Sequence, residues 1–190
     1  MIPIDGWSEL IYRTGGISRG IARRSALAML ANDILEMVTA YRHDGISFFE
    51  AGDMVNSLAG CWYAMGWLDT GCCLGLLTTP HYNRTWPDVT GSFDKDNTIR
   101  LDEKTGRYEN MLRRAILSVD IAPEQATDAY MIADRLLVVA RFFHSWGIYS
   151  NNRKESGFPL ACFSYGYGWL DCGVRTGFFR ICGSQDLFTI

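Results

Sequence analysis

The stretch Ser57–Leu77, SLAGCWYAMGWLDTGCCLGLL, returns in altered form as Pro159–Phe179, PLACFSYGYGWLDCGVRTGFF. The motif Gly-Trp-Leu-Asp begins at Gly66 in the first stretch and at Gly168 in the second, which gives an offset of 102 residues, the difference between 168 and 66. A gapless match of this length indicates an internal duplication. The same offset pairs Met29 with Met131, Leu35 with Leu137, Gly45 with Gly147, and Gly75 with Gly177.

The duplication predicts two similar units joined by a connector. We assign residues 1–77 to the first unit, residues 78–104 to the connector, and residues 105–190 to the second unit with a short tail. Each unit is small for a self-sufficient hydrophobic core, so we expect the two units to support each other. The connector is rich in proline and charged residues and is long for a plain loop, so it is either an ordered strap or a partner-binding excursion.

Each unit is expected to contain three helices. The last helix of the first unit is apolar nearly all round, which indicates burial on more than one side. Gly52 is expected to end the second helix and Asp53 to cap the third. The predicted helices are residues 1–13, 18–49 and 54–77 in the first unit, and helices that start near residues 107, 122 and 157 in the second. We therefore predict an all-α fold in which two tandem three-helix bundles pack as a pseudo-dimer through their Gly-Trp-Leu-Asp helices.

The charge balance argues against a mainly electrostatic nucleic-acid binder. The net charge is −3 and the pI is about 5.6, whereas such a binder needs a surplus of basic residues. The duplicated stretch carries Asp69 and Asp171 near its centre, so we expect no membrane insertion. RNA binding remains a weaker hypothesis, and it would depend on a patch formed by Arg13, Arg19, Arg23, Arg24, Arg113 and Arg114.

The six cysteines lie mostly in apolar helical sequence, and they form neither a Cys-x-x-Cys motif nor a Cys/His ligand pattern. We interpret them as small buried residues of a protein in a reducing cytoplasm. We expect neither a metal nor a cofactor.

Two motifs resemble a known family. The first unit carries Phe48-Phe49-Glu50-Ala51-Gly52-Asp53 and Tyr63-Ala64-Met65-Gly66-Trp67-Leu68-Asp69, and the second carries Arg107-Tyr108-Glu109-Asn110-Met111-Leu112 and Tyr165-Gly166-Tyr167-Gly168-Trp169-Leu170-Asp171. These motifs resemble short archaeal proteins grouped as domain of unknown function family 357. The resemblance implies small three-helix domains, an archaeal cytoplasmic source and no particular activity. Tandem copies depart from the usual single domain, and the second copy has lost the Gly-Asp turn.

Asp69 and Asp171 are the strongest candidates for a functional site. A carboxylate among apolar neighbours needs a partner, or its pKa rises. Arg175 lies four residues after Asp171, a spacing that permits an ion pair, whereas Asp69 would need His43, Arg42 or the other unit. The two aspartates either fix helix packing through hydrogen bonds or face a shared cleft between the units. The further candidates to line that cleft are Tyr63, Tyr165, Trp67, Trp169, His43 and His144.

The sequence contains no nucleophile–base motif, phosphate-binding glycine loop or His-Glu-x-x-His motif, and this absence argues against an enzyme. Our leading hypothesis is a non-enzymatic protein-interaction or adaptor module with a protein partner. The alternative is a small-molecule-binding protein or enzyme, with its site between the two units at Asp69 and Asp171.

Overall fold

The computed structural model describes residues 15–79, 95–153 and 157–189. Within these ranges the chain forms five α-helices, two pairs of very short antiparallel strands and one 3₁₀ turn, η1 (Gln185–Leu187). The elements in chain order are β1 (Gly16–Ile17), α2 (Ala26–Glu50), α3 (Met54–Cys73), β2 (Leu77–Thr78), α4 (Lys95–Leu117), β3 (Val119–Ile121), α5 (Asp128–Asn152), α6 (Phe158–Arg175) and β4 (Phe179–Ile181).

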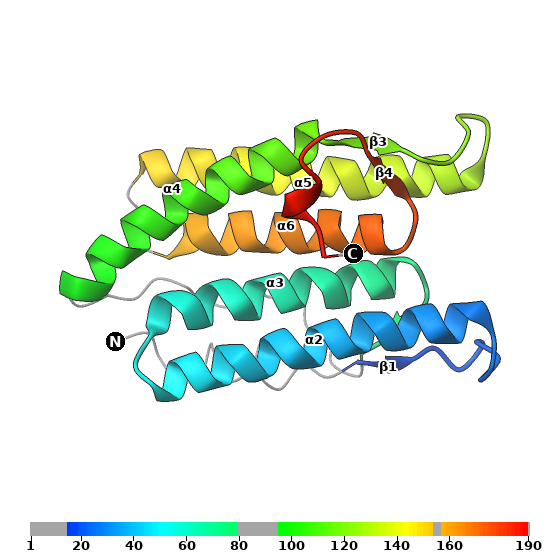
Figure 1. Cartoon of the computed structure of the whole chain (residues 1–190), viewed down its shortest axis with the longest axis horizontal. Coiled ribbons are helices and arrows are strands. Elements are labelled where there is room, and N and C mark those ends of the chain that lie inside the picture. The colour runs from blue at the N-terminus through cyan, green and yellow to red at the C-terminus, as the bar shows by residue number, and fades with distance from the viewer. Residues whose placement is uncertain (1–14, 80–94, 154–156, 190) are drawn as a thin grey trace.

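The helices stack in the order α2, α3, α6, α5, and α4 lies obliquely against α5 and α6 (Figure 1). Helices α2 and α3 form one antiparallel hairpin, and α5 and α6 form another. At the centre, α3 and α6 pack together and run in the same direction. The prediction of an all-α fold with two helical halves packed together is confirmed. The predicted helix at residues 1–13 lies outside the described residues.

Helices α2 and α5 begin with equivalent caps. The Ser25 hydroxyl accepts a hydrogen bond from the Ala28 amide at 3.1 Å, and the Thr127 hydroxyl accepts one from the Tyr130 amide at 3.2 Å. Both caps satisfy an amide that a helix start leaves without an intrahelical partner. Helices α2 and α5 therefore begin several residues later than predicted.

Helices α3 and α6 end at equivalent glycines. Gly75 and Gly177 have φ angles of +70° and +79°, which side chains other than glycine rarely adopt. Beyond them, the Leu76 amide donates to the Gly71 carbonyl at 3.0 Å, and the Phe178 amide donates to the Gly173 carbonyl at 2.9 Å. This pattern is the Schellman helix end, and it stops α3 at Cys73, before the end predicted at residue 77.

A short strand pair then closes each half. Ile17 of β1 pairs with Leu77 of β2, and Ile121 of β3 pairs with Phe179 of β4. The pair β1–β2 joins the chain before α2 to the chain after α3, and the pair β3–β4 joins the chain before α5 to the chain after α6. The sequence does not predict these strands, because two or three residues are too few to show an alternating pattern.

The turn between α2 and α3 is confirmed as predicted. Gly52 has a φ angle of +78°, and the Asp53 carboxylate accepts a hydrogen bond from the Asn56 amide at 3.1 Å. Helix α4, by contrast, begins at Lys95, inside the stretch that we assigned to the connector. The domain boundaries themselves stay a prediction.

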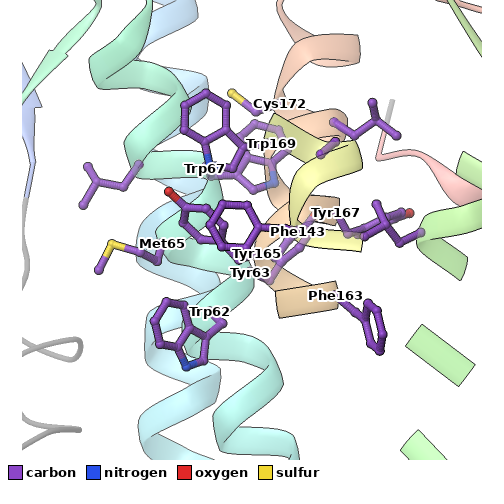
Figure 2. Close-up of a cluster of buried hydrophobic side chains, with 14 of the residues drawn as sticks. Trp62, Tyr63, Met65, Trp67, Phe143, Phe163, Tyr165, Tyr167, Trp169 and Cys172 are labelled. Atoms are coloured by element: carbon purple, nitrogen blue, oxygen red, sulfur yellow. The ribbon is translucent and has the colours of Figure 1, made fainter. Parts of the chain in front are cut away.

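One hydrophobic core extends through both halves. Its largest fully buried side chains include Trp62 and Trp67 of α3 and Phe163 of α6. Figure 2 shows the aromatic side chains of this core gathered between the central helices. Across the described ranges, every helix falls short of the apolar length that a membrane crossing requires.

Candidate functional site

The central helices come together at the glycine of each Gly-Trp-Leu-Asp motif. A Cβ atom built on Gly66 would lie 2.5 Å from the carbonyl oxygen of Tyr165, and one built on Gly168 would lie 2.5 Å from that of Tyr63. Only glycine permits this approach of two backbones. The structure therefore places equivalent positions of the two copies face to face.

Two tyrosine–aspartate hydrogen bonds span this crossing. The Tyr165 hydroxyl donates to Oδ2 of Asp69 at 2.7 Å, and the Tyr63 hydroxyl donates to Oδ2 of Asp171. The pairs are related by the 102-residue offset, so each half supplies one hydroxyl and one carboxylate. The partner that the sequence required for Asp69 thus comes from the other unit.

Two pairs of surrounding aromatic rings are also related by the 102-residue offset. The rings of Tyr41 and Tyr63 meet edge to face at 4.4 Å, and those of Phe143 and Tyr165 meet at 4.5 Å, with interplanar angles of 63° and 66°. Phe143, Tyr63 and Tyr165 lie close together in Figure 2. The candidate tryptophans Trp67 and Trp169 are buried beside the tyrosines, at ring distances of 6.3 Å from Tyr63 and 6.1 Å from Tyr165.

The two aspartates differ in their surroundings. Asp171 is fully buried and also accepts hydrogen bonds from the Thr189 amide at 3.0 Å and the Thr189 hydroxyl at 2.9 Å. Burial raises the pKa of Asp171, although the hydrogen bonds from Tyr63 and Thr189 act to lower it. Asp69 is only partly buried. Protein donors therefore surround the Asp171 carboxylate, which favours the packing interpretation for this residue.

The remaining predicted site residues lie elsewhere. Arg175 forms an ion pair with Asp33 of α2 at 2.9 Å, so the ion pair that its spacing permitted with Asp171 is not the one that forms. His43 is exposed beside Asp44, and His144 lies against the ring of Phe163, where burial lowers its pKa. The structure thus gathers the tyrosines, tryptophans and aspartates but not these three residues.

Only some of the cysteines are buried, although we expected all six to be. All six are free thiols, of which Cys61, Cys162 and Cys172 are buried and Cys73 and Cys182 are exposed. Burial raises the pKa of Cys61 to about 11, as for an unreactive thiol. In the part of the chain that the structure describes, no group of three or more His, Cys, Asp or Glu side chains could hold a metal ion.

A second candidate site was missed from the sequence. A cleft of about 160 Å³ lies where the start of α3 meets α4. Its charged residues on α4 are spaced so that three cations share one helical face. This spacing indicates a shared face only when residues 95–104 form a helix, and we had assigned them to the connector. The lining consists of Asp53, Val55, Asn56, Arg100, Glu103, Lys104 and Arg107.

The charged side chains that line this cleft differ in whether a side chain of opposite charge lies beside them. Arg100 pairs with the Asp53 carboxylate at 2.8 Å. Lys104 donates a hydrogen bond to the neutral side chain of Asn56, and burial together with the charge of Arg107 lowers its pKa. Among the described residues, neither Lys104 nor Arg107 forms an ion pair. Because the carboxylates of Asp53 and Glu103 also line the cleft beside its three cations, the cleft has a net charge of +1 available to an anionic group.

The predicted arginine patch is not assembled in one place. The described arginines before α2 and those near the end of α4 lie in different layers of the helix stack, separated by α3 and α6 (Figure 1). Arg114 also donates to the Ser184 hydroxyl at 3.0 Å and lies 3.8 Å from the Asp186 carboxylate. Arg13 lies outside the described residues.

No curated protein matches the chain, and no solved structure matches it. A family model described as "Protein of unknown function (DUF357)" matches residues 16–77 and again residues 107–179. The two matches cover more than half of the chain and correspond to the two halves that pack through α3 and α6. The chain therefore belongs to the DUF357 family, and it carries two tandem copies of the family's domain.

Proposed function

We propose that this protein is a non-enzymatic, cytoplasmic protein-interaction module that binds an acidic segment of a partner in the cleft between α3 and α4. The observation that carries the proposal is the pair of cations, Lys104 and Arg107, which line the cleft without a carboxylate partner among the described residues. A glutamate or aspartate side chain of a partner would supply the missing charge.

The chemistry of the cleft distinguishes it from the rest of the molecule. The chain has a net charge of −3, so a small positive cleft stands out against an acidic background. Such local complementarity selects partners and orients them during encounter more than it adds raw affinity. A short acidic segment fits these properties better than a long polyanion, which the acidic surface would repel.

The surroundings of the cleft suit a peptide. The start of α4 extends beyond the neighbouring ends of α3 and α6 (Figure 1). Ile99, next to Arg100, is 62% exposed and offers an apolar contact beside the charges. The cleft also joins the first copy of the domain to the start of α4, because Asp53 and Asn56 lie in the first family match whereas Arg100 and Lys104 precede the second match, which begins at residue 107.

Binding of a fluorescein-labelled polyglutamate peptide, followed by fluorescence anisotropy at low salt, tests the proposal. We expect saturable binding that weakens as salt rises, because salt screens exposed charges. Replacing Lys104 and Arg107 together by glutamate should weaken binding by at least about tenfold, roughly 1.4 kcal/mol. The matched control makes the same charge change at Arg23 and Arg24, two exposed arginines before α2.

Two results would reject the proposal. The first is an equal loss of binding in the control variant, which would indicate non-specific attraction. The second is tighter binding of a single-stranded RNA of equal charge, which would favour the nucleic-acid hypothesis.

The alternative function, a small-molecule site at Asp69 and Asp171, has a separate test. Native mass spectrometry of protein purified without added ligands would reveal a bound molecule as excess mass that disappears on denaturation. Loss of that mass in the variant with Asp69→Asn and Asp171→Asn would support a ligand site between the units. A bare chain would favour the interaction module.

A further inference from the structure

An apolar stripe runs along the outer face of α5. It consists of Met131, Val138, Phe142 and Tyr149, whose side chains are 63%, 52%, 54% and 52% exposed. The four positions are separated by seven, four and seven residues. With 3.6 residues per turn, these separations keep all four side chains within about 40° of one another around the helix. A helix of a single soluble domain usually turns polar residues to this face.

The duplicated half shows that the fold itself does not require this stripe. The equivalent positions of α2, 102 residues earlier, are Met29, Glu36, Ala40 and Ser47. Met29 is exposed to 64%, so the first position is shared, but the other three have become polar or small. The stripe is therefore a property of the second unit, and it needs an explanation other than internal packing.

We infer that a second copy of this chain covers the stripe, with the two α5 helices antiparallel about a two-fold axis. The spacing of the stripe reads the same in both directions, which is the property that a two-fold contact demands. In this arrangement Met131 meets Tyr149 of the second copy, and Val138 meets Phe142 of the second copy. Each apolar side chain thus meets an apolar side chain.

The charges at the ends of α5 support the antiparallel direction. Asp128 and Arg153 are exposed and lie on the same flank of the stripe, at opposite ends of the helix. The two-fold contact places Asp128 opposite Arg153 of the second copy, twice per dimer, whereas a parallel contact would place Asp128 level with Asp128 and Arg153 level with Arg153, so neither carboxylate would meet an arginine. Arg141 lies near the axis but about 80° from the stripe, so it stays at the solvated rim.

The contact follows one helix pair along its length. From Met131 to Tyr149 the helix rises about 27 Å, which resembles the seam of a short two-stranded coiled coil. Such an interface is at the small end of specific interfaces, so we expect a Kd on the order of micromolar. The inference is independent of the proposed function, because the stripe is on α5 and the cleft is between α3 and α4.

Sedimentation velocity of the full chain over a range of concentrations tests the inference. We expect a reversible dimer that Phe142→Glu weakens at least tenfold. The matched control is Ala40→Glu, the same substitution at the equivalent, exposed position of α2, and it should leave the dimer intact. A chain that stays monomeric throughout, or a dimer that both variants weaken equally, would overturn the inference.

Charge reversal provides a second test of the dimer that leaves Phe142 in place. Such a test is needed because the Phe142 ring also packs on Phe143 and Trp146, so that its replacement can disturb folding. Asp128→Arg alone and Arg153→Asp alone should each weaken the dimer, and the two together should restore it. Failure of the double reversal to restore the dimer would refute the antiparallel contact. Polyglutamate binding should be unchanged in all these variants, which separates this inference from the proposed function.

Discussion

Replacing Gly66 by alanine should destabilise the protein through the crossing of α3 and α6. The added Cβ would lie 2.5 Å from the carbonyl oxygen of Tyr165 and 3.0 Å from the Cα of Gly168. Both atoms belong to the backbone of the opposing helix, so no flexible side chain can move aside. Because ordinary van der Waals contact begins near 3.4 Å, the helices would have to separate by roughly 1 Å at this point.

The size of the effect follows from two opposing contributions. Overpacking a tight contact typically costs about 1–3 kcal/mol. Alanine in place of glycine inside a helix returns about 1 kcal/mol through helix propensity. Gly106 in α4 provides the matched control, because a Cβ built there meets nothing within 4 Å. The difference in the free energy of unfolding between the two variants isolates the packing cost, which we expect to be about 1–3 kcal/mol.

Urea denaturation followed by far-ultraviolet circular dichroism measures this difference. Gly106→Ala should be as stable as the wild type or slightly more stable, and Gly66→Ala should be less stable. Gly168→Ala should behave like Gly66→Ala, and the double variant should lose less than the sum of the two, because one widened crossing accommodates both methyl groups. If Gly66→Ala were as stable as Gly106→Ala, the close crossing of the two helices would be refuted.

Three further predictions concern the same region. Tyr63→Phe should lower the free energy of unfolding by about 1–3 kcal/mol, and by more than Tyr165→Phe does. The reason is that Tyr63 donates to the fully buried Asp171, whereas water can replace Tyr165 at the partly buried Asp69. Equal losses in urea denaturation would contradict this prediction. Burial raises the pKa of Asp171 above its ordinary 3.8, so the folded chain keeps this proton longer than the unfolded chain. The raised pKa therefore stabilises the folded chain fully below pH 3.8, and this stabilisation is lost as the pH rises through the pKa of the folded state. Asp171→Asn should remove this pH dependence from the melting temperature, measured in thermal melts across pH. Finally, a thiol reagent should quickly label the exposed Cys73 and Cys182 of the native chain. Rapid labelling of the buried cysteines would contradict the packing described; these are Cys61, Cys162 and Cys172.

The sequence predicted the parts of the fold that depend on the duplication. Two copies of Gly-Trp-Leu-Asp imply two equivalent helices that pack together, but the sequence did not predict that these helices cross at Gly66 and Gly168. The same motif identified Asp69, Asp171 and the two tyrosines as neighbours of this contact. It did not predict that each tyrosine would bind the aspartate of the other unit, because helical periodicity assigns a residue to a face but not to its partner on another helix.

The features that were missed depend on local chemistry or on long-range contacts. The start of α4 at Lys95 was hidden by a dense run of charged residues, which also concealed the basic face formed by Arg100, Lys104 and Arg107. On α5, the apolar residues at helical spacing include both Leu137, which is buried, and Phe142, which is exposed. Spacing alone does not distinguish an inward-facing stripe from an outward-facing one, since this depends on which neighbours the helix receives.

The most direct test of the proposed function is a heteronuclear NMR titration of the isotope-labelled full chain with the polyglutamate peptide. The proposal predicts that backbone amide shifts change chiefly at residues 53–56 and 100–107, and that these changes disappear when Lys104 and Arg107 are replaced by glutamate. Shift changes centred on the exposed arginines before α2, or no changes at all, would contradict the assignment of this cleft as the partner-binding site.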